Sequence, residues 1–155
     1  MKKSVPVFTP EPEKEPELPA HLMAEKFILG AILIDNAAME GLELLPEHFS
    51  LESNQRIYQA MLTLADFNSG IDRATLSHEL ARTKQLVDVG VPYLTDLTLG
   101  MPSRPHVKDY VRIVKEKYRL RQLIMACQKA SDRAWDQSED AADIIFTLEK
   151  EIGSL

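Results

Sequence analysis

The sequence has few of the residues on which several protein classes depend. One cysteine among 155 residues, Cys127, excludes an internal disulfide, as is typical of proteins from a reducing compartment. Six glycines and few β-branched runs provide little material for a large sheet. The longest apolar run, Phe27–Ile34, is far shorter than the ~20 residues of a membrane span. We therefore expect a cytoplasmic protein that does not contact a membrane.

Residue patterns for catalysis are also missing. None of the glycines precedes a lysine, and no two are close enough to form a phosphate-binding loop, so ATP hydrolysis by this chain is not expected. The four histidines, His21, His48, His78 and His106, have no metal-ligand spacing. Cys127 lies on an apolar stripe without a basic neighbour to stabilise a thiolate. The sequence predicts no catalytic, cofactor-binding or metal-binding residue in this chain.

The residues that are abundant favour helices. Leu, Ala, Glu, Lys, Arg, Met and Gln dominate the composition, and all are strong helix formers. Residues 1–19 differ, because they hold five of the nine prolines, alternating with glutamates. This stretch is predicted to be a disordered leader, and a proline-rich docking motif is the alternative. The fold class expected for the rest is all-α, with a five- to six-helix head over residues 20–101 and a long antiparallel helical hairpin over 102–155.

Apolar spacing and capping residues divide the head into short helices. A buried helix runs from His21 to about residue 34, and Asn36 is expected to cap a short helix that ends before Pro46. Ser53 or Asn54 opens the third helix, and Asp72 caps the fourth. A fifth, short helix is expected from Pro92.

The last third differs in kind, because nothing breaks a helix from Pro105 to about Asp136. Such a helix is ~45 Å long. Ser138 is expected to cap a final helix that folds back on it as a hairpin. The long helix carries more apolar surface than one partner needs, so we expect pairing with a second subunit. The predicted oligomer interface comprises Val107, Val111, Val114, Tyr118, Ile145, Leu148 and Ile152.

Basic residues are concentrated in the first part of this helix, although the net charge of the chain is −6. Between Arg104 and Arg121, seven basic residues stand against two acidic ones. One interpretation is a solvated face that pairs with the acidic last helix. The alternative is a free-standing DNA-binding or primosome accessory protein that uses this stretch to contact phosphates. We favour the first, so that any DNA contact is weak or indirect.

The order of segments resembles the N-terminal domain of the DnaB family of bacterial replicative DNA helicases. The similarity runs in order from about residue 18 to the C-terminus. Its segments are Ala24–Asn36, Glu47-His48-Phe49, Asn54–Met61, Tyr93–Leu97, Tyr110–Lys117 and Leu120–Ile124.

This resemblance implies a structural role rather than catalysis. In the family, hairpins of neighbouring subunits pair, and six subunits form a trimer-of-dimers collar above the motor domains, which hold ATP and Mg²⁺. The resemblance also implies docking of primase, and in some lineages of a helicase loader. By position, Tyr93 and Ile124 would face primase, although each can equally be read as a packing residue.

Overall fold

The computed structural model describes residues 17–155, and every regular element in this range is helical, which confirms the all-α fold class. Most of the predicted leader, residues 1–16, lies outside the described residues. Within the described range no helix is long and apolar enough to span a membrane. The elements are α1 (Leu22–Ile34), η1 (Asn36–Met39), η2 (Pro46–His48), α2 (Glu52–Asp66), α3 (Arg73–Arg82), α4 (Leu86–Val89), α5 (Val91–Asp96), α6 (Val107–Asp136) and α7 (Ala141–Gly153).

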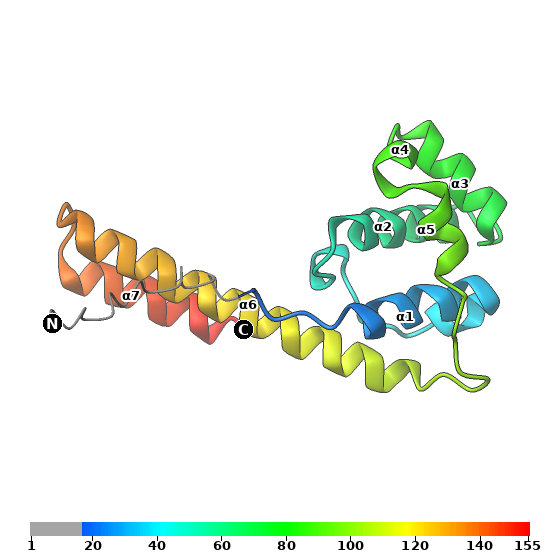
Figure 1. Cartoon of the computed structure of the whole chain (residues 1–155). Helices are drawn as coiled ribbons and strands as arrows, with labels where there is room; N and C mark the ends of the chain where they lie inside the picture. The colour runs from blue at the N-terminus through cyan, green and yellow to red at the C-terminus, as the bar shows by residue number, and fades with distance from the viewer. Residues whose placement is uncertain (1–16) are drawn as a thin grey trace, which may run out of the picture.

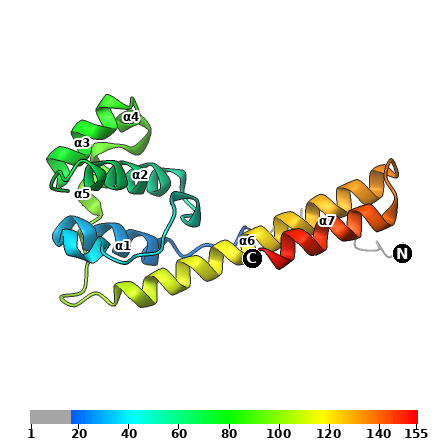
Figure 2. The ribbon, with the colours of Figure 1, turned by 180° about the vertical axis from the view of Figure 1, so that it is seen from behind.

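The helices stack in layers at one end of the molecule, and α6 extends from this stack (Figures 1 and 2). The first part of α6 packs against α1, α1 packs against α2, and α2 packs against α3 and α4. We call α1–α5 with η1 and η2 the head. The second part of α6 leaves the head and pairs with the antiparallel α7, forming the hairpin. The long hairpin helix expected from the sequence is therefore confirmed.

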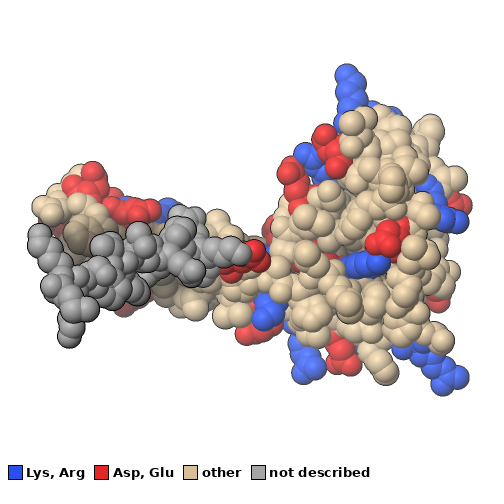
Figure 3. Space-filling view, viewed as in Figure 1, with Lys and Arg blue, Asp and Glu red and all other residues tan. Residues whose placement is uncertain are grey.

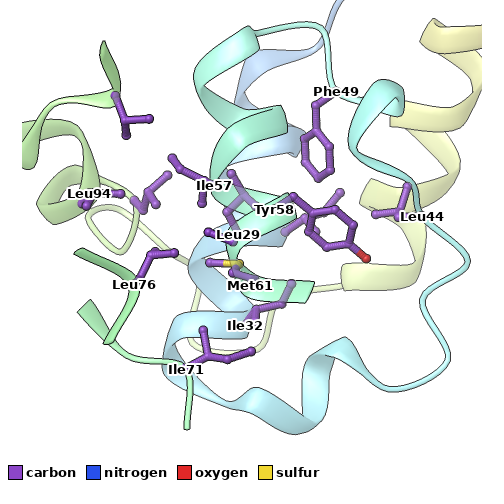
Figure 4. Packing of buried hydrophobic residues seen from close by; sticks show 14 of the residues in the cluster. Leu29, Ile32, Leu44, Phe49, Ile57, Tyr58, Met61, Ile71, Leu76 and Leu94 are labelled. Atoms are coloured by element: carbon purple, nitrogen blue, oxygen red, sulfur yellow. The ribbon is translucent and has the colours of Figure 1, made fainter. Parts of the chain in front are cut away.

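The core of the head is centred on α1, which is apolar on nearly all sides because other helices cover it. Ile28, Leu29 and Ile32 are fully buried. The ring of Phe49 lies beside that of Tyr58 from α2, with 5.1 Å between the centroids (Figure 4). Leu76 and Leu94 close the core from α3 and α5 (Figure 4).

Local sequence explains several element boundaries. The predicted cap at Asp72 is confirmed, because its Oδ1 accepts the backbone N–H groups of Ala74 and Thr75 at the start of α3. The helix predicted between Asn36 and Pro46 is too long, because the structure has only the 3₁₀ helix η1 in the first part of this segment. Its cap is Asp35, because the Asn36 amide instead binds the backbone of Ile32 and Ile71.

Two further predictions of boundaries are corrected. α7 is not capped by Ser138, whose hydroxyl group bonds to Asp136 instead. Gln137 ends α6 in the left-handed conformation, with φ 57°. The chain then reverses direction over residues 138–140, and α7 begins at Ala141. The short helix α4 was not expected from the sequence.

Candidate assembly and docking surface

The first part of α6 uses its apolar stripe inside the chain. Val114 is 1% exposed and belongs to the head core, and Val107 and Val111 pack against that core. These three residues were expected at a subunit interface. Their position leaves little surface for another subunit, because the side chains already face α1. Apolar periodicity reveals a stripe, but it does not show which partner covers it.

Arg121 marks the point where α6 leaves the head. It is 8% exposed, and its Nη1 and Nη2 donate hydrogen bonds to the carbonyl oxygens of Pro19 (2.9 Å) and His48 (2.7 Å). Its guanidinium lies over the ring of Tyr118, 5.7 Å from the centroid. Tyr118 in turn contacts the His48 ring at 4.7 Å between centroids. Tyr118, the fourth residue of the predicted stripe, is therefore half-buried at this junction.

Beyond Arg121, a narrow seam joins α6 to α7. Ala126 and Ile144 are buried in it, and Leu148 is half-buried beside them. Two ion pairs border this seam. Lys129 Nζ lies 2.7 Å from Glu151, and Arg133 Nε donates to Glu139 at 2.8 Å. Leu148, which was predicted for the oligomer interface, is thus half-buried within the hairpin.

One side of the hairpin carries exposed apolar side chains from both of its helices. Successive helical residues are rotated by about 100°. Cys127 follows the seam residue Ala126, and Ile145 follows Ile144. Because α6 and α7 run antiparallel, the residue that follows a seam residue points toward the same side of the hairpin in both helices. Cys127 and Ile145 therefore lie on one side. Leu123, Ala134 and Ile152 follow the residues Gln122, Arg133 and Glu151 beside the seam, so they lie on that side too, and all three are exposed.

We call the set Leu123, Cys127, Ala134, Ile145 and Ile152 the hairpin face. Ile145 is 55% exposed and Ile152 41%, so much of their apolar surface contacts solvent. Ile124, predicted to face primase, lies at the outer edge of this face and is 39% exposed. Ile145 and Ile152 of the predicted oligomer interface lie on this face, and their pairing with a second subunit stays a prediction.

Tyr93, the other residue predicted to face primase, belongs to a buried polar network in the head. Its hydroxyl donates to Asn54 Oδ1 at 2.7 Å, and Asn54 Nδ2 donates to Glu25 Oε2 at 2.8 Å. Burial raises the pKa of Tyr93, which is half-buried. Tyr93 lies on α5 and Ile124 on the hairpin (Figure 1), so the two do not form a single surface within one chain.

Sequence reasoning missed Glu25, which is 1% exposed. Its Oε1 accepts the backbone N–H of Ser50 at 2.8 Å, beside the start of α2. Leu51, the N-cap residue of α2, has no side-chain acceptor, so Glu25 supplies the negative charge from α1. Neither Ser53 nor Asn54 caps α2 as expected. The only signal in the sequence was a carboxylate inside an apolar run.

Three of the seven basic residues between Arg104 and Arg121 are engaged within the chain. Arg121 is buried, Lys115 lies 3.4 Å from Glu43 of the head, and Arg112 lies 3.4 Å from Asp109. The expected pairing with the last helix is therefore wrong for these residues. On the side seen in Figure 3, basic and acidic residues intermingle over the head. Neither observation favours the DNA-binding alternative.

The described residues include no group of three or more His, Cys, Asp or Glu side chains placed to hold a metal ion. His21, one of the candidate ligands considered, caps α1 by accepting the Ala24 N–H at 3.1 Å on its Nδ1.

Comparison with known proteins shows the family of this chain. Residues 17–116 match the model of the DnaB-like helicase N-terminal domain. The replicative DNA helicase DnaC of Bacillus subtilis (strain 168) is 34% identical over 137 residues, covering 86% of this chain and 30% of that protein. The DnaB helicase of Geobacillus stearothermophilus is 36% identical over 131 residues, covering 83% and 29%. This chain therefore belongs to the DnaB-like helicase N-terminal domain family.

Solved structures agree with this assignment. The N-terminal domain of the Mycobacterium tuberculosis DnaB helicase superposes with a TM-score of 0.83 at 28% identity, covering 90% of this chain and all of that one. A DnaB-like replicative helicase described with its interactions with primase gives a TM-score of 0.70 at 25% identity, covering 85% and 31%. The chain thus spans about a third of the length of the Bacillus subtilis and Geobacillus stearothermophilus helicases.

Proposed function

We propose that this chain is the assembly and docking domain of a replicative DNA helicase. In this role the hairpin pairs with that of a second copy, and such dimers build the trimer-of-dimers collar of a ring, in the bacterial cytoplasm. The observation that carries the proposal is the hairpin face, which is apolar and has no partner among residues 17–155 of a chain from this helicase family. ATP and Mg²⁺ belong, in this proposal, to the motor region of the helicase.

Burial of the hairpin face supplies a physical reason for pairing. Complete burial of an exposed leucine or isoleucine side chain contributes roughly 1.5–3 kcal/mol. In a two-fold dimer each residue of the face is used twice, once from each copy. Ile145, Ile152 and Leu123 are 55%, 41% and 38% exposed, so the burial of each from two chains contributes about half of this amount toward offsetting the entropy of association.

The test is the mass of the chain in sedimentation velocity at increasing concentration. We expect the wild type to associate and the double variant Ile145→Glu, Ile152→Glu to remain monomeric, because each carboxylate would be buried in the interface. Phe146→Glu is the matched control, since Phe146 is 68% exposed and lies on the side of α7 away from the seam. A wild-type chain that stays monomeric at ~100 µM, where weak association becomes visible, would contradict the proposal.

Cys127 gives a second readout at the same surface. It is the single cysteine of the chain, is exposed and lies on the hairpin face. Its rate of maleimide labelling should fall as the chain concentration rises. A labelling rate independent of concentration in an associating chain would place the interface elsewhere.

Primase is the proposed partner of this domain, and a helicase loader is a further one in systems that use a loader. Support comes from the similar DnaB-like helicase described with its interactions with primase. We assign Tyr93 and Ile124 to the primase contact, which in an assembly can be shared between neighbouring chains. Tyr93→Ala and Ile124→Ala should each weaken primase binding in calorimetry at least tenfold, as central contacts of interfaces do. Val87→Ala, at a side chain 92% exposed, is the control and should bind normally.

A further inference from the structure

Two buried side chains hold the Tyr93 ring from inside the head. The Tyr93 hydroxyl donates to Asn54 Oδ1 at 2.7 Å, and Asn54 Nδ2 donates to Glu25 Oε2 at 2.8 Å. The three residues come from α5, α2 and α1 in turn. Asn54 is 0% exposed and Glu25 1%, so water does not compete for the bond between them. The half-buried Tyr93 is therefore connected to the interior of the head by two hydrogen bonds.

The carboxylate of Glu25 determines the direction of both bonds. A carboxylate accepts hydrogen bonds but does not donate them, so the NH₂ group of Asn54 must face Glu25. The Asn54 oxygen then faces Tyr93, and the Tyr93 hydroxyl must be the donor. Glu25 is itself held in place, because the Ser50 N–H donates to its Oε1 at 2.8 Å. Tyr93 thus has one bonded orientation, in which its hydroxyl points into the head.

The helix that carries Tyr93 is anchored independently of this hydroxyl. Leu94 is 1% exposed in the core, and Asp96 accepts a hydrogen bond from Lys26 Nζ of α1 at 2.7 Å. We therefore expect α5 to stay in place when the bond to Asn54 is broken, while the Tyr93 ring becomes free to rotate. Because the hydroxyl points into the head, we also expect a partner to contact the ring rather than the hydroxyl.

We propose that Asn54 is a positioning residue for the partner contact of Tyr93, with Glu25 as its anchor. In the proposed function, on which this inference rests, the partner is primase. Asn54 holds the ring in one orientation before the partner arrives, so binding does not have to immobilise it. Immobilising one side chain on association lowers the affinity roughly threefold to tenfold. Loss of the Asn54 bond weakens docking by this factor, although Asn54 is too deeply buried to touch the partner.

The test measures primase affinity by calorimetry, with circular dichroism to show that each variant is folded. Tyr93→Phe keeps the ring and removes the hydroxyl, and its affinity should fall about threefold to tenfold. Asn54→Asp leaves Tyr93 unchanged, removes the donor to Glu25 and should cause a similar loss near pH 8. The double variant should lose no more than either single variant, because both changes break the same chain of bonds. In Asn54→Asp the Tyr93 ring signals in NMR should also shift, which reports the released ring directly.

The pH dependence of Asn54→Asp adds a readout that is specific to this chain of bonds. Two carboxyl groups held side by side cannot both ionise, so the pKa of one of them is raised. As the pH falls from about 8 to about 6, the pair takes up a proton, and the introduced group can donate to Glu25 as the amide did. The primase affinity of this variant should therefore recover toward the wild-type value at the lower pH.

Asn36→Asp is the matched control, because the Asn36 amide also donates within the head, to the backbone oxygens of Ile32 and Ile71. This variant should be less stable than the wild type, yet it should bind primase as the wild type does at both pH values. A loss of affinity that recovers at the lower pH in this control as well would show a general effect of stability, and the positioning role would be wrong.

The same measurements separate a failure of the positioning role from a failure of the primase assignment. If Tyr93→Ala binds primase as tightly as the wild type, the assignment of Tyr93 is wrong and the positioning role fails with it. If Tyr93→Ala weakens binding but Tyr93→Phe and Asn54→Asp bind normally, the assignment stands and the positioning role is wrong. If Tyr93→Phe weakens binding but Asn54→Asp does not, the hydroxyl contacts primase directly, which also overturns the positioning role.

Discussion

The head and the hairpin of this chain bury apolar side chains to very different degrees. In the head, Ile28, Leu29, Met61 and Leu76 are all 0% exposed. In α6 beyond Arg121 and in α7, the buried apolar residues are Ala126 and Ile144, and polar pairs border their seam. The head therefore has its own core, whereas the hairpin leaves apolar side chains such as Ile145 and Ile152 uncovered by residues 17–155. This difference separates the self-contained core of the domain from the surface to which we assign assembly.

The largest expected difference in stability between the head and the hairpin comes from replacing one phenylalanine in each by alanine. Phe49→Ala in the head should destabilise the chain by about 3–5 kcal/mol, because the ring is fully buried beside Tyr58. Phe146→Ala in the hairpin should change stability by less than about 0.5 kcal/mol, since that side chain is 68% exposed. Urea unfolding followed by circular dichroism measures both. Similar losses would mean that the hairpin has a core comparable with that of the head.

Matched glycines provide the next test. A Cβ at Gly30 would lie 2.3 Å from the backbone oxygen of Leu97, so α1 and the end of α5 approach through this glycine. Gly30→Ala should cost about 3 kcal/mol, because a backbone segment must shift. Gly153 in α7 has open space around it, and Gly153→Ala should leave stability unchanged or slightly increased. A Gly30→Ala variant as stable as wild type would show that the contact relaxes freely.

The same contrast explains how much the sequence could predict. Apolar periodicity predicted α1, α3 and α6 well, because their stripes are local properties of the chain. It could not show that the stripe at Val107, Val111 and Val114 faces the head, since the covering residues of α1 are some 80 positions away. It also assigned Leu148 to the oligomer interface, because apolar spacing does not reveal which side of α7 the partner helix α6 occupies.

Polar positions were harder to predict for a similar reason. Glu25 appears unpaired in the sequence, yet its partners Ser50 and Asn54 lie 25 and 29 residues further along. Asn36 reads as a helix cap by residue type, but its amide binds Ile71, 35 residues away. In both cases long-range hydrogen bonds replaced the local cap that residue preferences favour.

Glu25 gives a third prediction, of intermediate size. Glu25→Gln keeps the shape of the side chain but replaces one acceptor oxygen with an NH₂ group that faces the donors of Ser50 or Asn54. Leaving buried donors unsatisfied should cost about 2 kcal/mol. Glu149→Gln, at an exposed position of the hairpin, should have no measurable effect. The Tyr93–Asn54 bond should also weaken in the Glu25 variant, visible as a change in the Tyr93 ring signals. An unaltered midpoint in urea would show that the Asn54 amide reorients without cost.

The smallest effect compares two exposed carboxylates, one from each region. Hydrogen bonds from the Thr75 and Ala74 backbone lower the pKa of Asp72, and the hydrogen bond from Arg133 lowers that of Glu139. A lowered pKa in the folded state means that each group stabilises the fold above its ordinary pKa, 3.8 for Asp72 and 4.5 for Glu139. This stabilisation begins to decrease as the pH falls below the ordinary pKa of each group, and it is lost once the pH falls through the lowered pKa of the folded state.

Salt should distinguish the two carboxylates. Asp72→Asn keeps a capping oxygen on α3 but should reduce the loss of thermal stability between pH 6 and pH 3, at low and at high salt alike. Glu139→Gln should reduce the same loss at low salt only, because 1 M salt screens an exposed ion pair to within ~3 Å. Melting temperatures of the two variants and the wild type at both pH values and both salt concentrations measure this. High salt could also abolish the difference in acid stability between Asp72→Asn and the wild type. The charge of Asp72, and not its hydrogen bonds, would then stabilise the start of α3. The head and the hairpin would in that case depend on electrostatics in the same way.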